Sequence, residues 1–174
     1  MKKFLALALV FALALGLLAG CGEAKQEPEG GDEAVNVCVV VSSTFGDRSF
    51  NDSAKEGADK LAADYENITI STIECNNENF DAQMQNAADT ANIVVCVGWE
   101  FYNVETIALD YPDVYWIWVD NATGAPVSNV LNITYAQNEG SYLAGYIAAA
   151  MSESGVIGAV GGEDSDTLND FIVG

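Results

Sequence analysis

The sequence predicts an α/β fold in which a doubly wound parallel sheet carries helices on both faces. Three observations predict it. From residue 35 onward, short apolar runs rich in β-branched residues alternate with segments that have apolar residues at helical spacing. Two of the runs, around Val39–Val41 and Ile93–Val95, are apolar at consecutive positions, as expected for strands that are covered on both sides. Repeated strand–helix–strand units with right-handed crossovers then give a doubly wound layer.

The expected elements alternate in regular order along the chain. The expected strands are Val35–Val41, Ile68–Ile73, Ile93–Val97, Val114–Val119, Val130–Ile133 and Val156–Val160. The expected helices are Asn51–Tyr65, Phe80–Thr90, Phe101–Tyr111 and Asn138–Met151. The stretch between Val119 and Val130 contains Gly124 and Pro126 and is too short for a helix. A direct step from strand to strand is therefore expected there.

The first twenty residues predict an export signal and are excluded from the fold. Lys2 and Lys3 precede the uncharged apolar run Phe4–Ala19, which is too short and too early in the chain for a membrane-spanning helix. The run ends in the tetrapeptide LAGC, which resembles a lipobox and indicates a lipid on Cys21. The alternative is an ordinary signal peptide followed by a chance cysteine. The lipobox predicts a protein anchored to the cell membrane by its lipid, with the folded part on the extracytoplasmic face.

The segment after Cys21 is polar and the rest of the chain is strongly acidic. Residues 21–34 contain proline, paired glycine and almost no apolar side chain, which predicts a flexible acidic tether. Without residues 1–20, four basic residues remain against 26 acidic ones, a net charge of −22. Such a surface repels phosphates, which excludes nucleic acid as a partner. The sequence has no histidine, so the commonest general base and metal ligand is missing.

Three cysteines remain once Cys21 carries the lipid. Cys38 and Cys96 lie inside apolar runs, where a free thiol behaves as a small core residue. Three thiols cannot pair fully within one chain, and a Cys38–Cys75 disulfide is the alternative left open. The spacing of the three is not that of a metal site, and neither a metal nor a cofactor is expected.

Candidate ligand-binding residues follow the expected strands. In open α/β sheets, ligands bind beyond the carboxyl ends of the strands. This rule selects the loop that begins at Ser42 and Ser43 after the first strand, and it selects Gly98 and Trp99 after the third. It also selects Asp120 after the fourth strand. The acidic residues after Gly162 lack the spacing of a calcium loop and indicate a solvated turn.

Each candidate also has a purely structural interpretation. Phe50 offers a ring face for stacking and Asn51 an amide for a polar edge, but Asn51 or Ser49 could instead cap the following helix. Trp99 is either a second aromatic wall or a rim residue packed on a neighbouring loop. Asp120 either accepts sugar hydroxyl hydrogens or initiates a turn. The sequence has no nucleophile-elbow motif, P-loop or Rossmann glycine motif after the first strand, so a binding protein is favoured over an enzyme.

Several segments together resemble the basic membrane protein (BMP) family. They are FGDRSFNDSAKEGADKL, NIVVCVGWEF with YPDVYWIWVDN, and NVLNITYAQNEGSYLAGYIAAAM followed by GVIGAVGG. The family comprises substrate-binding lipoproteins of ABC transporters that are similar to purine-nucleoside receptors. The resemblance implies a periplasmic-binding-protein type I fold, whose two α/β lobes close on a ligand, and it implies permease and ATPase subunits as partners.

The resemblance also implies roles for individual residues. The Phe of Ser-Phe-Asn, here Phe50, would stack on a nucleobase, and Asn51 would bond its edge. Asp120 would contact the ribose, and Gly98 would let the ligand approach the backbone. Nucleoside-binding members usually carry an Asp just after the first strand, where Ser42 and Ser43 stand here. This departure keeps a receptor for a sugar or another small solute open as an alternative, beside a surface or sensory lipoprotein without a transport role.

The expected organisation has four parts. They are a lipoprotein signal peptide at 1–20, the tether at 21–34, an N-terminal ligand-binding lobe at 35–154, and the start of a second lobe at 155–174. In the last part, Gly155–Val160 resembles the strand that opens a second lobe, and Thr167–Val173 resembles the start of its first helix, so the sequence is expected to be truncated.

Overall fold

The computed structural model describes residues 33–121, 126–162 and 165–174 of the chain. The expected signal peptide, Cys21 and nearly all of the tether lie outside the described residues. The strands are β1 (Val35–Val41), β2 (Ile68–Glu74), β3 (Ile93–Val97), β4 (Tyr115–Val119) and β5 (Val130–Ile133). The helices are α2 (Phe50–Asp64), α3 (Phe80–Ala88), the 3₁₀ turn η1 (Trp99–Phe101), α4 (Val104–Ala108), α5 (Gln137–Met151) and α6 (Asp166–Val173).

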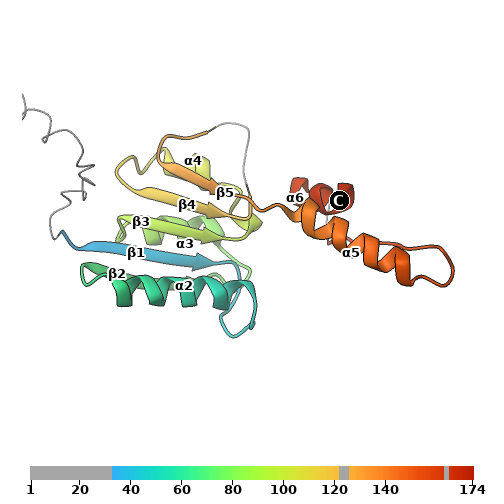
Figure 1. Ribbon diagram of the computed structural model, residues 1–174. Coiled ribbons are helices and arrows are strands. Elements are labelled where there is room, and N and C mark those ends of the chain that lie inside the picture. The colour runs from blue at the N-terminus through green and yellow to red at the C-terminus, as the bar shows by residue number, and fades with distance from the viewer. Residues whose placement is uncertain (1–32, 122–125, 163–164) are drawn as a thin grey trace, which may run out of the picture. The chain divides into compact units, whose positions relative to one another are not determined.

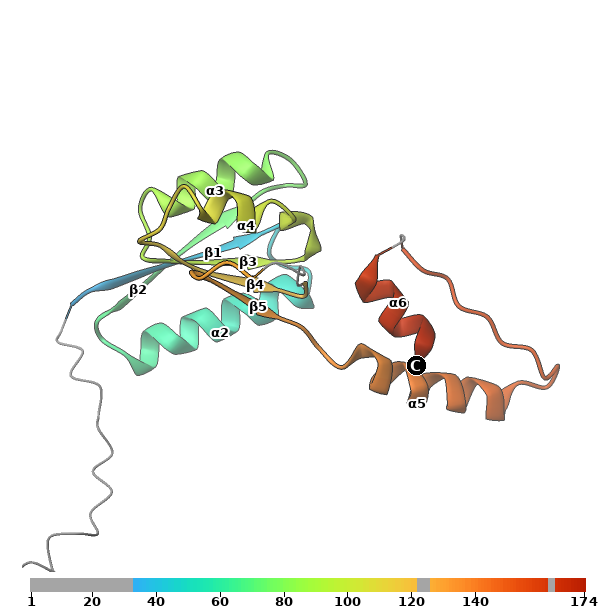
Figure 2. The same ribbon diagram turned by 90° about the horizontal axis from the view of Figure 1, so that it is seen from above.

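The five strands form one sheet in the order β2-β1-β3-β4-β5, and every neighbouring pair is parallel (Figure 1). Between β1 and β3 the register aligns Val37 with Ile93 and Val41 with Val97, so both strands end at the same level. Helix α2 lies on one face of the sheet, and α3 and α4 lie on the other (Figure 2). This arrangement confirms the predicted doubly wound parallel α/β fold.

Strand β1 is buried on both faces, and its successive side chains point to opposite sides of the sheet. Cys38 and Val40 belong to the core beneath α3 and α4, whereas Val39 and Val41 pack with Ala58 of α2. This alternation explains why the strand is apolar at consecutive positions. The larger core also holds the biggest fully buried side chains of the described residues, namely Trp116, Trp118, Phe101 and Met84.

The step from β4 to β5 is direct, as expected, because the described residues between them include no helix. Strand β5 pairs with β4 in parallel, with Trp116 opposite Val130 and Val119 opposite Ile133. Just before β5, the Asn129 Nδ2 donates to the carbonyls of Tyr111 (3.1 Å) and Val114 (2.9 Å). These bonds tie the loop that leads into β4 to the edge of the sheet.

Two expected elements are corrected by the structure. The helix expected at Phe101–Tyr111 is instead η1 followed by the short α4, because Asn103 interrupts the helical backbone (φ −90°, ψ 1°) and its Nδ2 donates to the Asp81 carboxylate. The strand expected at Val156–Val160 is irregular. Its Val156 and Val160 are exposed, and no described strand lies beside it to complete a hydrogen-bonded ladder.

The helical segment that follows the sheet, α5 with α6, is less buried than the sheet and the helices that cover it. Helix α5 has no buried residue and packs with α6. Its exposed apolar side chains are Tyr142, Leu143, Tyr146, Ile147 and Met151. Helix α6 covers the expected Thr167–Val173 and begins at Ser165, whose hydroxyl accepts the Leu168 N–H at 3.2 Å. Among the described helices, none has both the length and the apolar character to cross a bilayer.

Candidate ligand-binding site

The strand order places the candidate site at one point along the carboxyl ends of the strands. From β1 the chain continues to β2 on one side, whereas the later strands β3, β4 and β5 add on the other side. The order therefore reverses between β1 and β3, and open α/β sheets bind ligands at such a switch point. The loops that leave β1 and β3 carry Ser42 and Gly98, two of the predicted residues.

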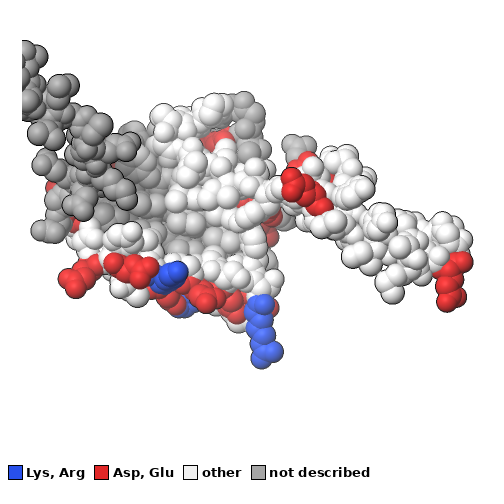
Figure 3. All heavy atoms as spheres, viewed as in Figure 1, with Lys and Arg blue, Asp and Glu red and all other residues white. Residues whose placement is uncertain are grey.

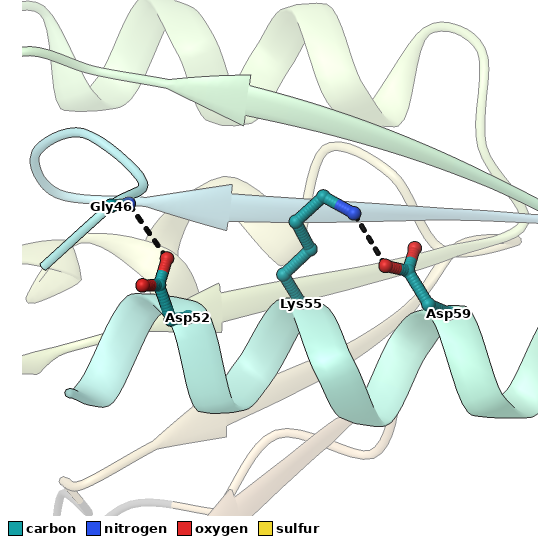
Figure 4. Close-up of polar contacts among 4 residues, drawn as sticks. All are labelled: Gly46, Asp52, Lys55 and Asp59. Carbon is teal, nitrogen blue, oxygen red and sulfur yellow. Dashed lines mark hydrogen bonds and ion pairs between the residues drawn. The ribbon is translucent and has the colours of Figure 1, made fainter. Parts of the chain in front are cut away.

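Two carboxylates hold the loop between β1 and α2. Asp47 accepts the backbone N–H groups of Ser49 (2.9 Å), Asn51 (3.0 Å) and Asp52 (3.1 Å). These bonds lower the pKa of Asp47, with the Ser49 N–H as the largest cause. Asp52 in turn accepts the N–H groups of Gly46 (2.7 Å) and Arg48 (2.8 Å), and the first of these bonds is drawn in Figure 4. The start of α2 is thus fixed by side chains of its own loop.

Asn51 lies in the first turn of α2 and is buried, with 5% of its surface exposed. Its Nδ2 donates to the Ser43 hydroxyl (3.0 Å) and to the Thr44 carbonyl (3.1 Å). Ser49 holds the cap position, as one alternative had it, but its side chain makes no cap bond, and Asp47 accepts the N–H groups of Asn51 and Asp52 instead. Asn51 is not the cap, because it lies inside α2. The Asn51 side chain instead joins α2 to the end of β1.

Phe50 and Trp99 are the two exposed aromatic residues of the predicted set. Phe50 begins α2 and is 39% exposed, and Trp99 begins η1 and is 42% exposed. The ring pairs among the described residues, Phe80 with Phe101 and Tyr111 with Trp116, include neither of them. Both rings therefore keep a surface on which a planar ligand could stack.

Gly98 occupies a backbone conformation that favours glycine, with φ at +121°. A Cβ at this position would collide with the Glu100 carboxylate and would lie 3.6 Å from the Ser42 hydroxyl. The Gly98 N–H donates to the Val119 carbonyl (3.2 Å), and its own carbonyl accepts the buried Trp118 Nε1 (2.9 Å). These contacts bring the ends of β1, β3 and β4 together around Gly98.

The carboxylates of Asp120 and Glu100 interact across the ends of β3 and β4. Asp120 has a positive φ of 71°, and its N–H donates to the Ile133 carbonyl at 2.8 Å. Burial raises the pKa of Asp120, and the nearby Glu100 charge raises it further. Sequence reasoning did not select Glu100. The signal was its place two residues after Gly98, but the approach of the Glu100 carboxylate to Gly98 is visible only in the structure.

Ser42 and Ser43 line the same region from the end of β1. Ser42 is buried, and its carbonyl accepts the Asn77 N–H at 2.8 Å. Ser43 is half-buried and uses its hydroxyl to accept the Asn51 amide. The structure thus brings five predicted residues together at the carboxyl ends of the strands, through direct contacts and adjacency in the chain: Ser42, Ser43, Asn51, Gly98 and Asp120.

The three described cysteines lie in the core next to this edge. Cys38, Cys75 and Cys96 are buried free thiols, so the alternative Cys38–Cys75 disulfide is not formed. Burial raises the pKa of all three, that of Cys75 to about 11, which keeps them protonated at neutral pH. Among the described residues, no group of three or more His, Cys, Asp and Glu side chains could hold a metal ion.

The comparisons with known proteins decide the family. The family model Bmp, described as an ABC transporter substrate-binding protein of PnrA-like type, matches residues 34–174. The chain belongs to this family. As a Bmp chain it is similar to "Basic membrane protein A" of Borreliella burgdorferi, at 29% identity over 83% of this chain and 43% of the relative. It is also similar to the protein of the same name in Borreliella afzelii, at 30% identity over 79% of this chain and 43% of the relative.

Solved structures agree with the Bmp assignment. An ABC transporter solute-binding protein from Aeropyrum pernix K1 matches 79% of this chain and 40% of its own, with a TM-score of 0.63 and 25% identity. A solute-binding protein from Conexibacter woesei matches 67% of this chain and 40% of its own, with a TM-score of 0.52 and 27% identity. The chain thus spans less than half the length of these relatives and structures.

Proposed function

We propose that this chain supplies one ligand-binding lobe of the substrate-binding protein of an ABC importer, and that the ligand is a nucleoside, with purines favoured. The observation that carries the proposal is the pairing of Phe50 with Asn51 at the switch point. The Phe50 ring is exposed at the start of α2, and the adjacent Asn51 is buried and fixed to the end of β1. A stacking surface beside an oriented amide suits a planar base with a polar edge.

The ribose would be bound by the neighbouring strand end. Asp120 is half-buried beside Gly98, so its carboxylate could accept two hydroxyl hydrogens of the sugar. Catalysis is not part of this proposal, since the family members are substrate-binding proteins. The permease and ATPase subunits of the importer would receive the ligand.

Calorimetric titration of the full-length protein with a panel of nucleosides tests the proposal. At least one purine nucleoside is expected to bind, and Phe50→Ala is expected to cost about 1–3 kcal/mol of its binding free energy. Tyr65→Ala is the matched control, because Tyr65 is an exposed aromatic residue just beyond the opposite end of α2. Failure of every nucleoside to bind would sink the proposal, and equal effects of the two variants would remove Phe50 from the site.

A sugar or another small solute is the second candidate ligand, and one observation favours it. Ser42 and Ser43 place hydroxyl groups at the end of β1, where the resemblance implies that nucleoside-binding members usually carry an Asp. Ribose offers only hydroxyl groups and no base to stack. Binding of ribose alone with the affinity of the whole nucleoside would favour this candidate over the first.

We further propose that Cys21 carries the lipid that fixes the protein to the extracytoplasmic face of the cell membrane. The LAGC tetrapeptide supports this proposal. Growth of the source cells with labelled palmitate should label the wild-type protein, whereas Cys21→Ser should remove the label and release the protein from the membrane fraction. A labelled Cys21→Ser protein would contradict it.

A further inference from the structure

Three of the polar side chains at the switch point offer a ligand hydrogen-bond acceptors rather than donors. Asn51 uses its Nδ2 within the protein, on the Ser43 hydroxyl and the Thr44 carbonyl. A carbonyl can only accept, so the amide orientation is fixed and Oδ1 is the group left over. Among the described residues, none donates to Oδ1. The one polar group that Asn51 can offer to a ligand is therefore an acceptor.

The carboxylates of the same edge are acceptors as well. Glu100 is half-buried, and its carboxylate lies over Gly98, close enough to collide with a Cβ at that position. Asp120 is half-buried at the end of the next strand and interacts electrostatically with Glu100. An ionised carboxylate has lone pairs and no hydrogen to donate. Three side chains, from the first turn of α2, from η1 and from the residue after β4, thus present acceptors at the carboxyl ends of the strands.

The described residues supply little positive charge to balance this edge. Ion pairing between described residues is confined to Lys55 and Asp59 on the outer surface of α2, drawn in Figure 4. Figure 3 shows the Lys and Arg side chains of this view along the α2 side of the molecule, interspersed with acidic residues. Arg48 lies on the first loop with its side chain exposed. A ligand that carries a negative charge would thus meet two carboxylates in a partly desolvated place.

We propose that the site selects ligands that present N–H and O–H donors and rejects ligands that carry a negative charge, and that Glu100 sets this preference. The inference rests on the proposed function and deepens it, because it separates nucleosides from nucleotides. A guanine base offers N–H donors on its edge, and a ribose offers hydroxyl hydrogens. A nucleoside 5′-phosphate offers the same donors but adds about two negative charges. Like charges placed together at a binding site are strongly unfavourable.

The test compares guanosine with guanosine 5′-monophosphate on three forms of the full-length protein by calorimetry. The wild type is expected to bind guanosine about 100-fold more tightly than the monophosphate. Glu100→Gln keeps the shape and removes the charge, so it should reduce this ratio about tenfold or more, mainly by strengthening monophosphate binding. Glu66→Gln removes the same charge from an exposed residue before β2, at the opposite end of the strands, and should leave the ratio unchanged.

The outcomes separate the inference from the proposed function. Binding of guanosine with a ratio near one in the wild type would overturn the charge preference and leave the nucleoside proposal intact. The wild type could instead show the expected preference for guanosine, with the ratio falling equally in Glu100→Gln and Glu66→Gln. This result would overturn the role of Glu100, because the effect would then come from the total charge. Absence of binding by guanosine and by every other nucleoside of the panel would overturn both proposals together.

Discussion

The sheet with its helices and the α5–α6 segment contrast in what they bury. The sheet carries apolar side chains on both faces, and α2, α3 and α4 cover them, so that Val40, Trp116 and Trp118 are almost fully buried. Helix α5 is as long as α2 and more apolar in composition, but it has no buried residue. Helix length and composition are therefore poor guides to which part of this chain is stabilised by a core.

The contrast has a consequence for the proposed binding site. Ser42, Ser43, Asn51, Gly98, Glu100 and Asp120 all lie on the part of the chain that has its own core. Their positions are set by strand ends and by local bonds such as Asn51 to Ser43. We therefore expect the geometry of this half of the site to persist without ligand. The contrast in burial also leads us to propose that the first lobe ends before α5, whereas the sequence analysis expected the lobe to end at residue 154.

The largest expected effect concerns whether each of the two regions folds when it is separated from the other. A chain of residues 34–135 should fold cooperatively and keep the near-ultraviolet circular dichroism of the buried Trp116 and Trp118. A peptide of residues 136–174 should be largely unfolded in water, because isolated helices of 15 and 8 residues are marginal without tertiary packing. Thermal denaturation of each piece is the measurement. A non-cooperative first piece, or a helical and cooperative second piece, would contradict the contrast.

The next effect sharpens the contrast with buried and exposed aromatic residues. Trp118→Phe leaves the buried Gly98 carbonyl without its 2.9 Å donor. Trp116→Phe is the control on the same face, because the buried Trp116 Nε1 has no partner among the described residues. We expect Trp118→Phe to cost about 1–3 kcal/mol more in unfolding free energy than Trp116→Phe. Tyr146→Phe on exposed α5 should stay within about 0.5 kcal/mol of wild type. Urea denaturation of the three variants measures these differences, and equal losses would refute the role given to the Gly98 bond.

A smaller effect concerns the first loop of the site. Three backbone N–H groups, that of Ser49 foremost, lower the pKa of Asp47 in the folded state. The stability that this carboxylate contributes is therefore present above its ordinary pKa and is lost as the pH falls through its lowered one. Asp47→Asn should lower the melting temperature at pH 7, and the difference from wild type should shrink on acidification. A difference that is independent of pH would show that the charge of Asp47 is unimportant.

The smallest expected effect is a gain in stability rather than a loss. Burial, and then Glu100, raise the pKa of Asp120, so the folded state holds the Asp120 proton more tightly than the unfolded chain does. Stability therefore falls as the pH rises through the raised pKa. Asp120→Asn should be slightly more stable than wild type at pH 7, and the two should converge below the ordinary pKa of Asp. Asn also tolerates the positive φ at this position. A less stable Asp120→Asn at neutral pH would contradict this account.

The sequence predicted the sheet well because its strands are apolar on one or both faces. Strands β1, β3 and β5 have the predicted bounds. The same pattern at Val156–Val160 misled, because a strand also needs a neighbour to pair with and composition cannot supply one. In α4, a single Asn103 bond to Asp81 overrides the helical spacing. The contact depends on two residues 22 positions apart, which periodicity does not detect.

The position of the proposed site follows from the sequence, whereas part of its polar chemistry is visible only in the structure. The rule that ligands bind beyond strand ends selected Ser42, Gly98 and Asp120. It did not reveal that Asn51 spends its Nδ2 on Ser43 and Thr44, nor that Glu100 turns toward Gly98. Both facts depend on side-chain directions, which the order of residues along the chain does not show.

The central claim is that the ligand binds at the switch point between β1 and β3, and a crystal structure of the full-length protein grown with guanosine tests it most directly. We predict that the base lies on the Phe50 ring, that a base N–H donates to the Asn51 Oδ1, and that the ribose hydroxyls donate to Asp120. A guanosine bound elsewhere, with Phe50 and Asn51 away from it, would contradict the claim.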